Sequence, residues 1–255
     1  MKHFANADIH CVNLRNKLAL ITGGARMGES IALALARHGV DVVLTYRSSK
    51  ASAIQIQKNL LKMGRQSWVT RCDVTREADI KKLMQFIQKK IGHLDILINL
   101  ASTYEKTPWD SLNEKVWQQQ IDNNVKGTYL MGIHASKLLK KHGGRIINFA
   151  DWVVASGRPN YKNFTPYYAA KSAVLGLTQV QALELAPTIL VNAIAPGPII
   201  PPAGATKKEI NTVMNATPLR RWGGASEIAK AVLFLCATDF VTGECIRVDG
   251  GRHLY

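Results

Sequence analysis

Short apolar segments recur along the chain, and longer amphipathic segments lie between them. The apolar segments show little polar alternation, which is typical of strands buried on both faces of a sheet. We expect such strands at residues 18–22, 41–46, 67–74, 95–101, 145–150, 189–196 and 245–251. The amphipathic segments are expected to be helical, and they include residues 29–38, 50–63, 77–91 and 114–141.

The alternation of expected strands and helices indicates an α/β protein. We predict a single doubly wound domain whose sheet has about seven strands and is mostly or wholly parallel. A chain of 255 residues is long enough to bury the core of one such domain. Residues 1–16 precede the first expected strand and are assigned to an N-terminal extension, and residues 17–255 are assigned to the domain.

Basic side chains give the chain a formal net charge of +15. A field of this sign favours anionic partners, among them nucleic acids and phosphorylated cofactors. The lysines and arginines are spread along the chain, however, and no zinc-finger spacing or other nucleic-acid-binding signature accompanies them. We therefore expect a solvated basic surface, no nucleic-acid partner and no metal site.

The four cysteines are scattered and form no CxxC pair. This usage is typical of reduced thiols rather than of a disulfide framework. No apolar run reaches the roughly 18–20 residues of a membrane span, and no secretory leader pattern opens the chain. These features predict a cytoplasmic protein with no membrane partner.

The segment ITGGARMGES, residues 21–30, lies between the first expected strand and the first expected helix. Gly23 and Gly28 give it the spacing G-x-A-x-x-G, which is common in dinucleotide-binding turns. Glycine lets the backbone approach a pyrophosphate closely, and the N–H groups at the start of the helix can bind it. The segment predicts a Rossmann-like nucleotide site with Gly23, Arg26, Met27 and Gly28 at the cofactor, although such glycines can also form a plain connection.

The end of the second expected strand indicates which dinucleotide is bound. NAD-selective sites usually place a carboxylate there to bind the ribose hydroxyls. This chain has Tyr46, Arg47 and Ser48 instead. A guanidinium and hydroxyl donors suit the additional phosphate of NADP, and Arg26 adds a second cation. We expect NADP(H) as the cofactor; the alternative is that Arg47 is an ordinary surface residue.

The segment YYAAK places Tyr167 and Lys171 four residues apart, on one face of a helix. It is accompanied by NVKG at 124–127, LINLA at 97–101 and APG at 195–197. Together, and in this order, these segments resemble the short-chain dehydrogenase/reductase family. The resemblance extends over nearly the whole chain and implies an NADP-dependent oxidoreductase.

Three details are most similar to the pteridine reductases and the dihydromonapterin reductase-type members of that family. They are TGGAR at 22–26, LAST at 100–103, and Asp151, which stands where most relatives have a catalytic serine. The usual turn of the family, T-G-x-x-x-G-x-G, has one residue more than the turn of this chain. The geometry of the shorter turn stays open, and we still expect it to bind the dinucleotide.

The resemblance implies a catalytic group of Asn124, Asp151, Tyr167 and Lys171. Tyr167 would donate a proton to the substrate as hydride leaves the nicotinamide. Tyrosine has an ordinary pKa of about 10 and is a poor acid near neutral pH. The ammonium of Lys171 would lower this pKa and also hold the nicotinamide ribose. Asn124 resembles the family residue that positions a water molecule in the proton relay.

Asp151 bears most directly on the substrate. A carboxylate repels a carbonyl oxygen or a developing alkoxide unless it is protonated, whereas it accepts hydrogen bonds from ring N–H and amino groups. This chemistry suits a pterin, with Tyr104 stacked on its ring and with Ser102, Asp151, Trp152 and Tyr167 as further contacts. A capping role for Asp151 and a core position for Trp152 are the structural alternatives.

Further cofactor contacts follow from the same resemblance. Asp73 and Val74 match the pair that meets the adenine, although Asp73 could instead cap the next helix. Residues 197–217 match the loop that closes over the substrate, and the C-terminal segment resembles members that assemble as homotetramers. The expected cofactor contacts are Gly23, Arg26, Met27, Gly28, Tyr46, Arg47, Ser48, Asp73, Val74, Asn99, Ala101, Ser102, Tyr167, Lys171, Pro196, Gly197 and Ile199.

Three functional hypotheses follow from the sequence. The first is an NADPH-dependent reductase of a dihydropterin or a related heterocycle. The second is a carbonyl reductase of the 3-oxoacyl carrier-protein type. Its acidic carrier would suit the basic surface, but that chemistry normally uses serine where this chain has Asp151. The third is a nucleotide-binding protein without turnover, which regulates a partner through cofactor occupancy.

Overall fold

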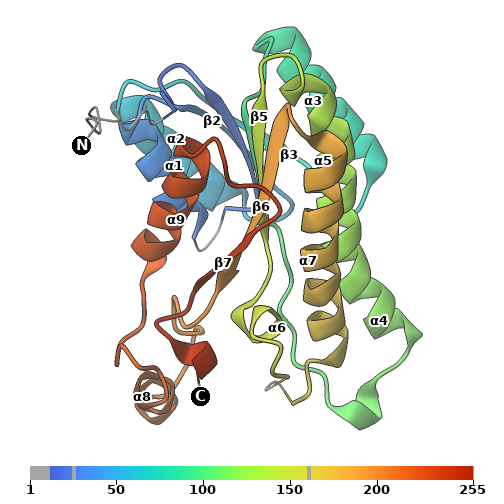
Figure 1. The fold of residues 1–255 in the computed structure, drawn as a ribbon, viewed down its shortest axis with the longest axis vertical. Helices are drawn as coiled ribbons and strands as arrows, with labels where there is room; N and C mark the ends of the chain where they lie inside the picture. The colour runs from blue at the N-terminus through green and yellow to red at the C-terminus, as the bar shows by residue number, and fades with distance from the viewer. Residues whose placement is uncertain (1–11, 25–26, 160–161, 255) are drawn as a thin grey trace, which may run out of the picture.

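The computed structural model describes residues 12–24, 27–159 and 162–254 (Figure 1). Within them, one seven-stranded sheet has the order β3-β2-β1-β4-β5-β6-β7, and every neighbouring pair is parallel. This sheet confirms the doubly wound α/β architecture expected from the sequence. The strands are β1 (Leu18–Thr22), β2 (Asp41–Tyr46), β3 (Ser67–Arg71), β4 (Ile96–Asn99), β5 (Gly144–Phe149), β6 (Ile189–Pro196) and β7 (Cys245–Val248).

Helices cover both faces of the sheet (Figure 1). One layer contains α1 (Gly28–Arg37), α2 (Lys50–Lys62) and α9 (Ala225–Ala237), and the other contains α3 (Glu77–Lys90), α4 (Glu114–Ile121), α5 (Gly127–Leu139) and α7 (Thr165–Leu185). Two short helices, α6 (Trp152–Ala155) and α8 (Lys207–Asn215), lie beyond the carboxyl end of the sheet. The remaining turns are η1 (Trp109–Ser111), η2 (Asp122–Lys126) and η3 (Arg252–Leu254).

Each face of the sheet has its own apolar core. Adjacent residues of a strand point to opposite faces. In β1, Ile21 therefore packs in the core under α1 and α9, whereas Leu20 packs in the core under α3 and α5. Ile98 and Leu97 of β4 divide in the same way. Burial on both faces explains why the strands have little polar alternation.

The expected helix over residues 114–141 is interrupted. α4 ends at Ile121, the π-helical turn η2 follows, and α5 begins at Gly127. In the π-turn the N–H of Gly127 donates to the carbonyl of Asp122, five residues back. The side-chain amides of Asn123 and Asn124 donate to the carbonyls four residues before them. Side chains thus bond the backbone where the regular helical ladder is broken, which periodicity alone does not predict.

Two other expected boundaries differ from the structure. The strand expected at 67–74 ends at Arg71, and the strand expected at 245–251 ends at Val248. The last strand is followed by Gly250 and Gly251, whose φ angles of 62° and 82° are incompatible with an extended strand. Of the expected extension, residues 12–16 are described, and Leu14 is buried in the core.

The described part of the chain contains no helix that is long and apolar enough to cross a membrane. The cysteines found there, Cys72, Cys236 and Cys245, are free thiols. The same residues include no group of histidine, cysteine and carboxylate side chains that could hold a metal ion.

Candidate active site

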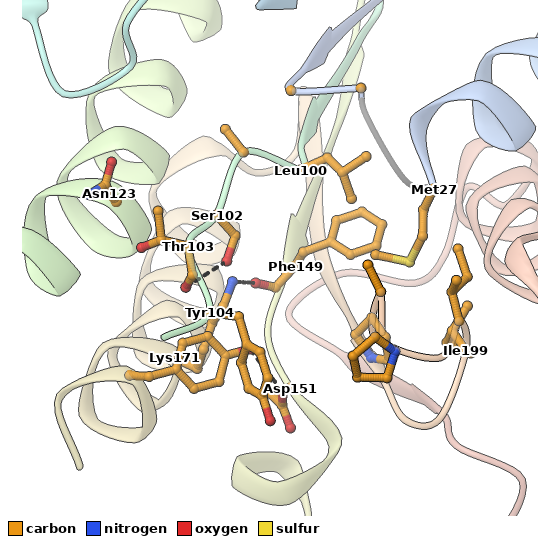
Figure 2. A pocket seen from close by; sticks show the side chains of 18 of the residues that line it. Met27, Leu100, Ser102, Thr103, Tyr104, Asn123, Phe149, Asp151, Lys171 and Ile199 are labelled. Atoms are coloured by element: carbon orange, nitrogen blue, oxygen red, sulfur yellow. Dashed lines mark hydrogen bonds between the residues drawn. The ribbon is translucent and has the colours of Figure 1, made fainter. Parts of the chain in front are cut away.

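A cavity of about 850 Å³ opens at the carboxyl ends of the parallel strands, as expected for this topology. Figure 2 shows Asp151, Tyr104 and Lys171 toward one side of it and Met27 and Ile199 toward the other. Most of the expected site residues line this cavity. They are Gly23, Met27, Tyr46, Arg47, Ser48, Asp73, Val74, Ala101, Ser102, Tyr104, Asp151, Trp152, Tyr167, Lys171, Pro196, Gly197 and Ile199.

Three expected residues do not line the cavity, and a fourth, Arg26, lies outside the described residues. Gly28 begins α1 and is buried beside the carbonyl of Gly23. Asn99 is buried, and its amide donates to Asn148 Oδ1 at 2.9 Å. Asn124 is fully buried behind the loop that contains Ser102 and Thr103.

The first turn of the site has the features that a dinucleotide requires. Gly23 has a φ of 66°, and a Cβ there would lie 3.0 Å from Ala101 Cα. Within the described residues, no side chain caps the N-terminus of α1 at Met27. The N–H groups of its first turn are therefore not engaged by a capping side chain, and such groups are suited to bind an anion. The residues present fit a pyrophosphate, although this turn is one residue shorter than the usual family turn.

A second close approach shapes the segment that follows β6. A Cβ on Gly197 would lie 2.4 Å from Asp249 Cβ, so only glycine allows the loop after β6 to pass the end of β7. The N–H of Gly197 donates to the carbonyl of Val248 at 2.9 Å. These contacts hold the segment from Pro196 to Ile199 along the cavity.

The end of β2 supplies the expected cation. Arg47 lines the cavity, and its Nη1 donates to Asn123 Oδ1 of η2 at 2.7 Å. Asp73 lies nearby and also lines the cavity, while its Oδ1 accepts hydrogen bonds from the N–H and hydroxyl of Thr75. Burial raises the pKa of Asp73, but these hydrogen bonds and the charges of Arg47 and Arg76 lower it overall. Asp73 thus stabilises the turn before α3 and borders the cavity at the same time.

Tyr167 and Asp151 form the centre of the site. The hydroxyl of Tyr167, on α7, donates to Asp151 Oδ2 at 2.9 Å, and both side chains are buried. Asp151 is the N-cap of α6, and its other oxygen accepts from the N–H of Val153 at 3.0 Å. Asp151 therefore caps α6 with Oδ1, as the structural alternative expects, while its Oδ2 bonds the tyrosine that is expected to be catalytic.

Lys171 lies one turn of α7 beyond Tyr167. Its Nζ donates to the carbonyl of Phe149 at 2.7 Å and lies 5.9 Å from the centre of the Tyr167 ring. Figure 2 shows this side chain reaching from α7 toward Phe149. The ammonium is thus held at the end of β5, close to the Tyr167–Asp151 pair.

Burial shifts the protonation of both charged groups. Desolvation raises the pKa of Asp151, and the hydrogen bonds from Val153 and Tyr167 and the charge of Lys171 oppose it only in part. Desolvation also lowers the pKa of Lys171 to about 8, against the opposing effect of Asp151. Both shifts favour the neutral forms of the two groups, as is common where side chains exchange protons.

Asn124 has a supporting position. Its Nδ2 donates to Gln120 Oε1 at 3.0 Å and to the carbonyl of Thr103 at 3.2 Å, and its Oδ1 accepts from the Ser102 hydroxyl at 2.6 Å. Gln120, which is 2% exposed, was not expected from the sequence because a glutamine on an amphipathic helix gives no signal of burial. Asn124 therefore fixes the loop that lines the cavity.

Aromatic rings enclose the substrate end. Tyr104 stacks on Phe164 with ring centres 4.6 Å apart, and it meets the Tyr167 ring edge-on at 4.9 Å. Trp152 is only 6% exposed and also lines the cavity, so it is both a buried residue and part of the pocket wall.

Glu209, Ile210 and Val213 of α8 also line the cavity, and they lie within the expected closing segment 197–217. Trp222 and Arg252 line it as well and were not expected, because they carry no motif and follow that segment in the chain.

The low pKa of Lys171 predicts a pH-dependent contribution to stability. The folded protein releases this proton at about pH 8, whereas lysine ordinarily does so at 10.5. The unfolded chain therefore binds more protons between these values, and folding becomes more favourable as pH rises through this window. Urea denaturation of the cofactor-free wild-type protein and of Lys171→Met gives the unfolding free energy of each. The wild-type value minus the variant's value should increase between about pH 8 and pH 10.5.

Lys58→Met provides a matched control, because Lys58 is exposed on α2. Its difference from the wild-type protein should stay constant over the same pH range. A constant difference for Lys171→Met would contradict the shifted protonation.

The fold and site can be compared with known proteins. Residues 24–253 match the family described as enoyl-(acyl carrier protein) reductase. A 3-oxoacyl-[acyl-carrier-protein] reductase of Staphylococcus epidermidis is 33% identical over 246 residues, covering 94% of this chain and 100% of the relative. A solved short-chain dehydrogenase/reductase of Serratia marcescens is 27% identical, with a TM-score of 0.88 over 95% of this chain and 100% of that chain.

A 7α-hydroxysteroid dehydrogenase, solved with NADH and 7-oxo glycochenodeoxycholic acid, is 31% identical with a TM-score of 0.87, covering 94% of this chain and 96% of that chain. The relatives' names favour the 3-oxoacyl alternative over the pterin expectation. They also support an NAD(P)-dependent oxidoreductase, which sets aside a binding protein without turnover. Because the family match spans most of the chain, the protein belongs to the short-chain dehydrogenase/reductase family.

Proposed function

We propose that this oxidoreductase uses NADPH to reduce a ring C=N bond of a pterin-like heterocycle. The observation that carries the proposal is the 2.9 Å hydrogen bond between the Tyr167 hydroxyl and the buried carboxyl group of Asp151. A carboxyl group in this position can accept from a ring N–H or amino group, and in its protonated form it can supply a proton.

The reaction requires one hydride at carbon and one proton at nitrogen. The reduced nicotinamide, when bound, supplies the hydride. Tyr167 holds the proton that goes to the ring nitrogen, and Asp151 can return a proton to the phenolate oxygen, because burial raises the carboxyl pKa. Lys171 stabilises developing negative charge on the Tyr167 oxygen from its place one helical turn away. The C=N bond becomes CH–NH, and the proton lost by the pair is replaced from water.

The charge at the end of β2 supports NADPH rather than NADH. Arg47 and Ser48 line the cavity there, and the segment from Tyr46 to Ser49 has no carboxylate that would bind unphosphorylated ribose hydroxyls. A guanidinium can bind a phosphate through two parallel N–H donors.

The walls of the substrate end support a flat ring. Tyr104 is 53% exposed at the cavity, and its face is stacked on Phe164. Trp152 lines the same end beside Asp151. Aromatic faces favour planar, polarised ring systems, so a heterocycle gains stacking energy that a flexible acyl chain lacks.

A second candidate is reduction of a 3-oxoacyl group on an acidic carrier protein, and the names of the relatives favour it. The net charge of +15 suits such a carrier. Its weakness lies at Asp151, because that chemistry normally uses a serine hydroxyl there, and a carboxyl group opposes the developing alkoxide whenever it is ionised.

The two candidates predict opposite substrate preferences. Parallel assays of NADPH oxidation should show at least tenfold higher kcat/KM for a dihydropterin than for a 3-oxoacyl thioester. In Asp151→Ser, which keeps a small hydrogen-bonding group, the pterin activity should fall about 100-fold or more, as for loss of a positioned acid. Faster turnover of the thioester by the wild-type protein would reject the first candidate and support the second.

Loss of the Tyr167 hydroxyl should separate chemistry from binding. Tyr167→Phe keeps the ring that packs against Tyr104 but has no proton to donate. We expect reductase activity to fall by about 100-fold or more, with NADPH affinity nearly unchanged. Tyr168→Phe, one residue along the same helix, should retain activity. Turnover by Tyr167→Phe at the wild-type rate would remove this tyrosine from the mechanism.

We also propose that the protein assembles as a homotetramer. Two helical faces carry exposed apolar side chains in the single chain: Trp117, Tyr129 and Ile133 on α4 and α5, and Val180 and Leu183 on α7. Exposed apolar clusters of this kind are typical of interfaces. Light scattering should give four times the chain mass of 28.1 kDa, and Leu183→Asp should lower the assembled mass. A wild-type mass of one chain would contradict this assembly.

A further inference from the structure

Arg47 is held in place by a residue from another part of the fold. Arg47 follows β2, whereas Asn123 lies in the π-turn η2, and Arg47 Nη1 and Asn123 Oδ1 are 2.7 Å apart. Arg47 is exposed at the cavity, while Asn123 is only 9% exposed. An exposed cation is thus bonded to a buried amide.

The orientation of the Asn123 amide is set by the helix that precedes it. Its Nδ2 donates to the carbonyl of Gln119 at 2.8 Å, which directs Oδ1 toward Arg47. The neighbouring Asn124 makes the corresponding bond to the carbonyl of Gln120 at 3.1 Å and directs its Oδ1 toward Ser102. The π-turn therefore presents two consecutive amides, one to the cation at the end of β2 and one to the loop at the catalytic centre.

We infer that Asn123 is a positioning residue that gives the site its selectivity for NADPH over NADH, by holding Arg47 where the 2′-phosphate binds. The inference rests on the proposed use of NADPH. An arginine side chain loses considerable rotamer freedom when it is fixed by a ligand. Because Asn123 already restricts Arg47, less of this entropy is lost on binding the phosphate.

The chemistry of the amide suits this role. A guanidinium has five N–H donors, so one bond to Asn123 leaves others for a phosphate. The amide oxygen is also uncharged, and it orients Arg47 without cancelling its charge. A carboxylate at the same place would pair with the cation and repel the phosphate. Asp73, the nearby carboxylate, has its Oδ1 engaged by Thr75.

The test is a double-mutant cycle read by titration with NADPH and with NADH. Asn123→Leu keeps the branched shape of the side chain but has no acceptor for Arg47. We expect it to weaken NADPH binding about tenfold, as for loss of a hydrogen bond to a charged group, with NADH binding changed less than about twofold. In the Arg47→Ala background, Asn123→Leu should have no further effect on NADPH affinity.

Two further variants make the readout specific. Gln118→Leu removes an exposed amide of the same helix, which bonds Asp122 and not Arg47, and both affinities should stay unchanged. Asn123→Asp keeps an oxygen acceptor but adds charge, and it should weaken NADPH binding at least as much as Asn123→Leu. Kinetics should show the change in KM for NADPH, because a disturbed Asn124 would instead lower kcat with both cofactors.

The outcomes separate this inference from the proposed function. If the wild-type protein does not prefer NADPH, the proposed cofactor use is wrong. If Arg47→Ala leaves the preference for NADPH intact, the cofactor use stands, but the role of Arg47 and with it that of Asn123 is wrong. If Arg47→Ala abolishes the preference while Asn123→Leu retains it, only the role of Asn123 is wrong. Equal losses of NADPH and NADH affinity in Asn123→Leu, or additive losses in the double variant, would also overturn the role of Asn123.

Discussion

Parallel pairing of β1 with strands on both of its sides is the constraint on which the rest of the site depends. Thr22, the last residue of β1, is level with Thr45 of β2 and Asn99 of β4. The chain therefore leaves all three strands at the same edge of the sheet. The Thr22 hydroxyl accepts hydrogen bonds from the N–H groups of Leu100 and Ala101, at 3.1 and 3.2 Å, and so joins two of these exits. The crevice exists because the crossovers turn in opposite directions on either side of β1.

The catalytic centre uses this crevice to bury charge at a cost in stability. Asp151 and Lys171 are 7% and 3% exposed, and burial of a charged group is unfavourable unless hydrogen bonds and an opposite charge compensate for it. Compensation here is partial, since desolvation remains the largest effect on both pKa values. Burial that shifts the pKa values of such groups is typical of proton-transfer sites, so the destabilising feature supports the role proposed for this pair.

The similarity to relatives and the chemistry of the site residues concern different parts of the protein. Likeness over nearly the whole chain reflects the sheet, its helices and the cofactor cleft, which members of a family share whatever they reduce. Substrate choice depends on the few groups that touch the reacting atoms. In the proposed reaction one of them is the carboxyl group of Asp151, which is bonded directly to the Tyr167 hydroxyl. We therefore give Asp151 more weight than the names of relatives at 33% identity.

The sequence alone determined the order of strands and helices and the family, and most of the site residues that it predicted line the cavity. Apolar runs and motif spacings are local properties of the chain. Glycines or a Tyr–Lys pair at fixed separations can therefore be recognised from the sequence. Tertiary structure decided which distant groups meet: Arg47 with Asn123, Tyr104 with Phe164, and Gly197 with Asp249. It also decided that residues 114–141 break at a π-turn. These outcomes depend on packing between segments far apart in the chain, which no periodicity within one segment encodes.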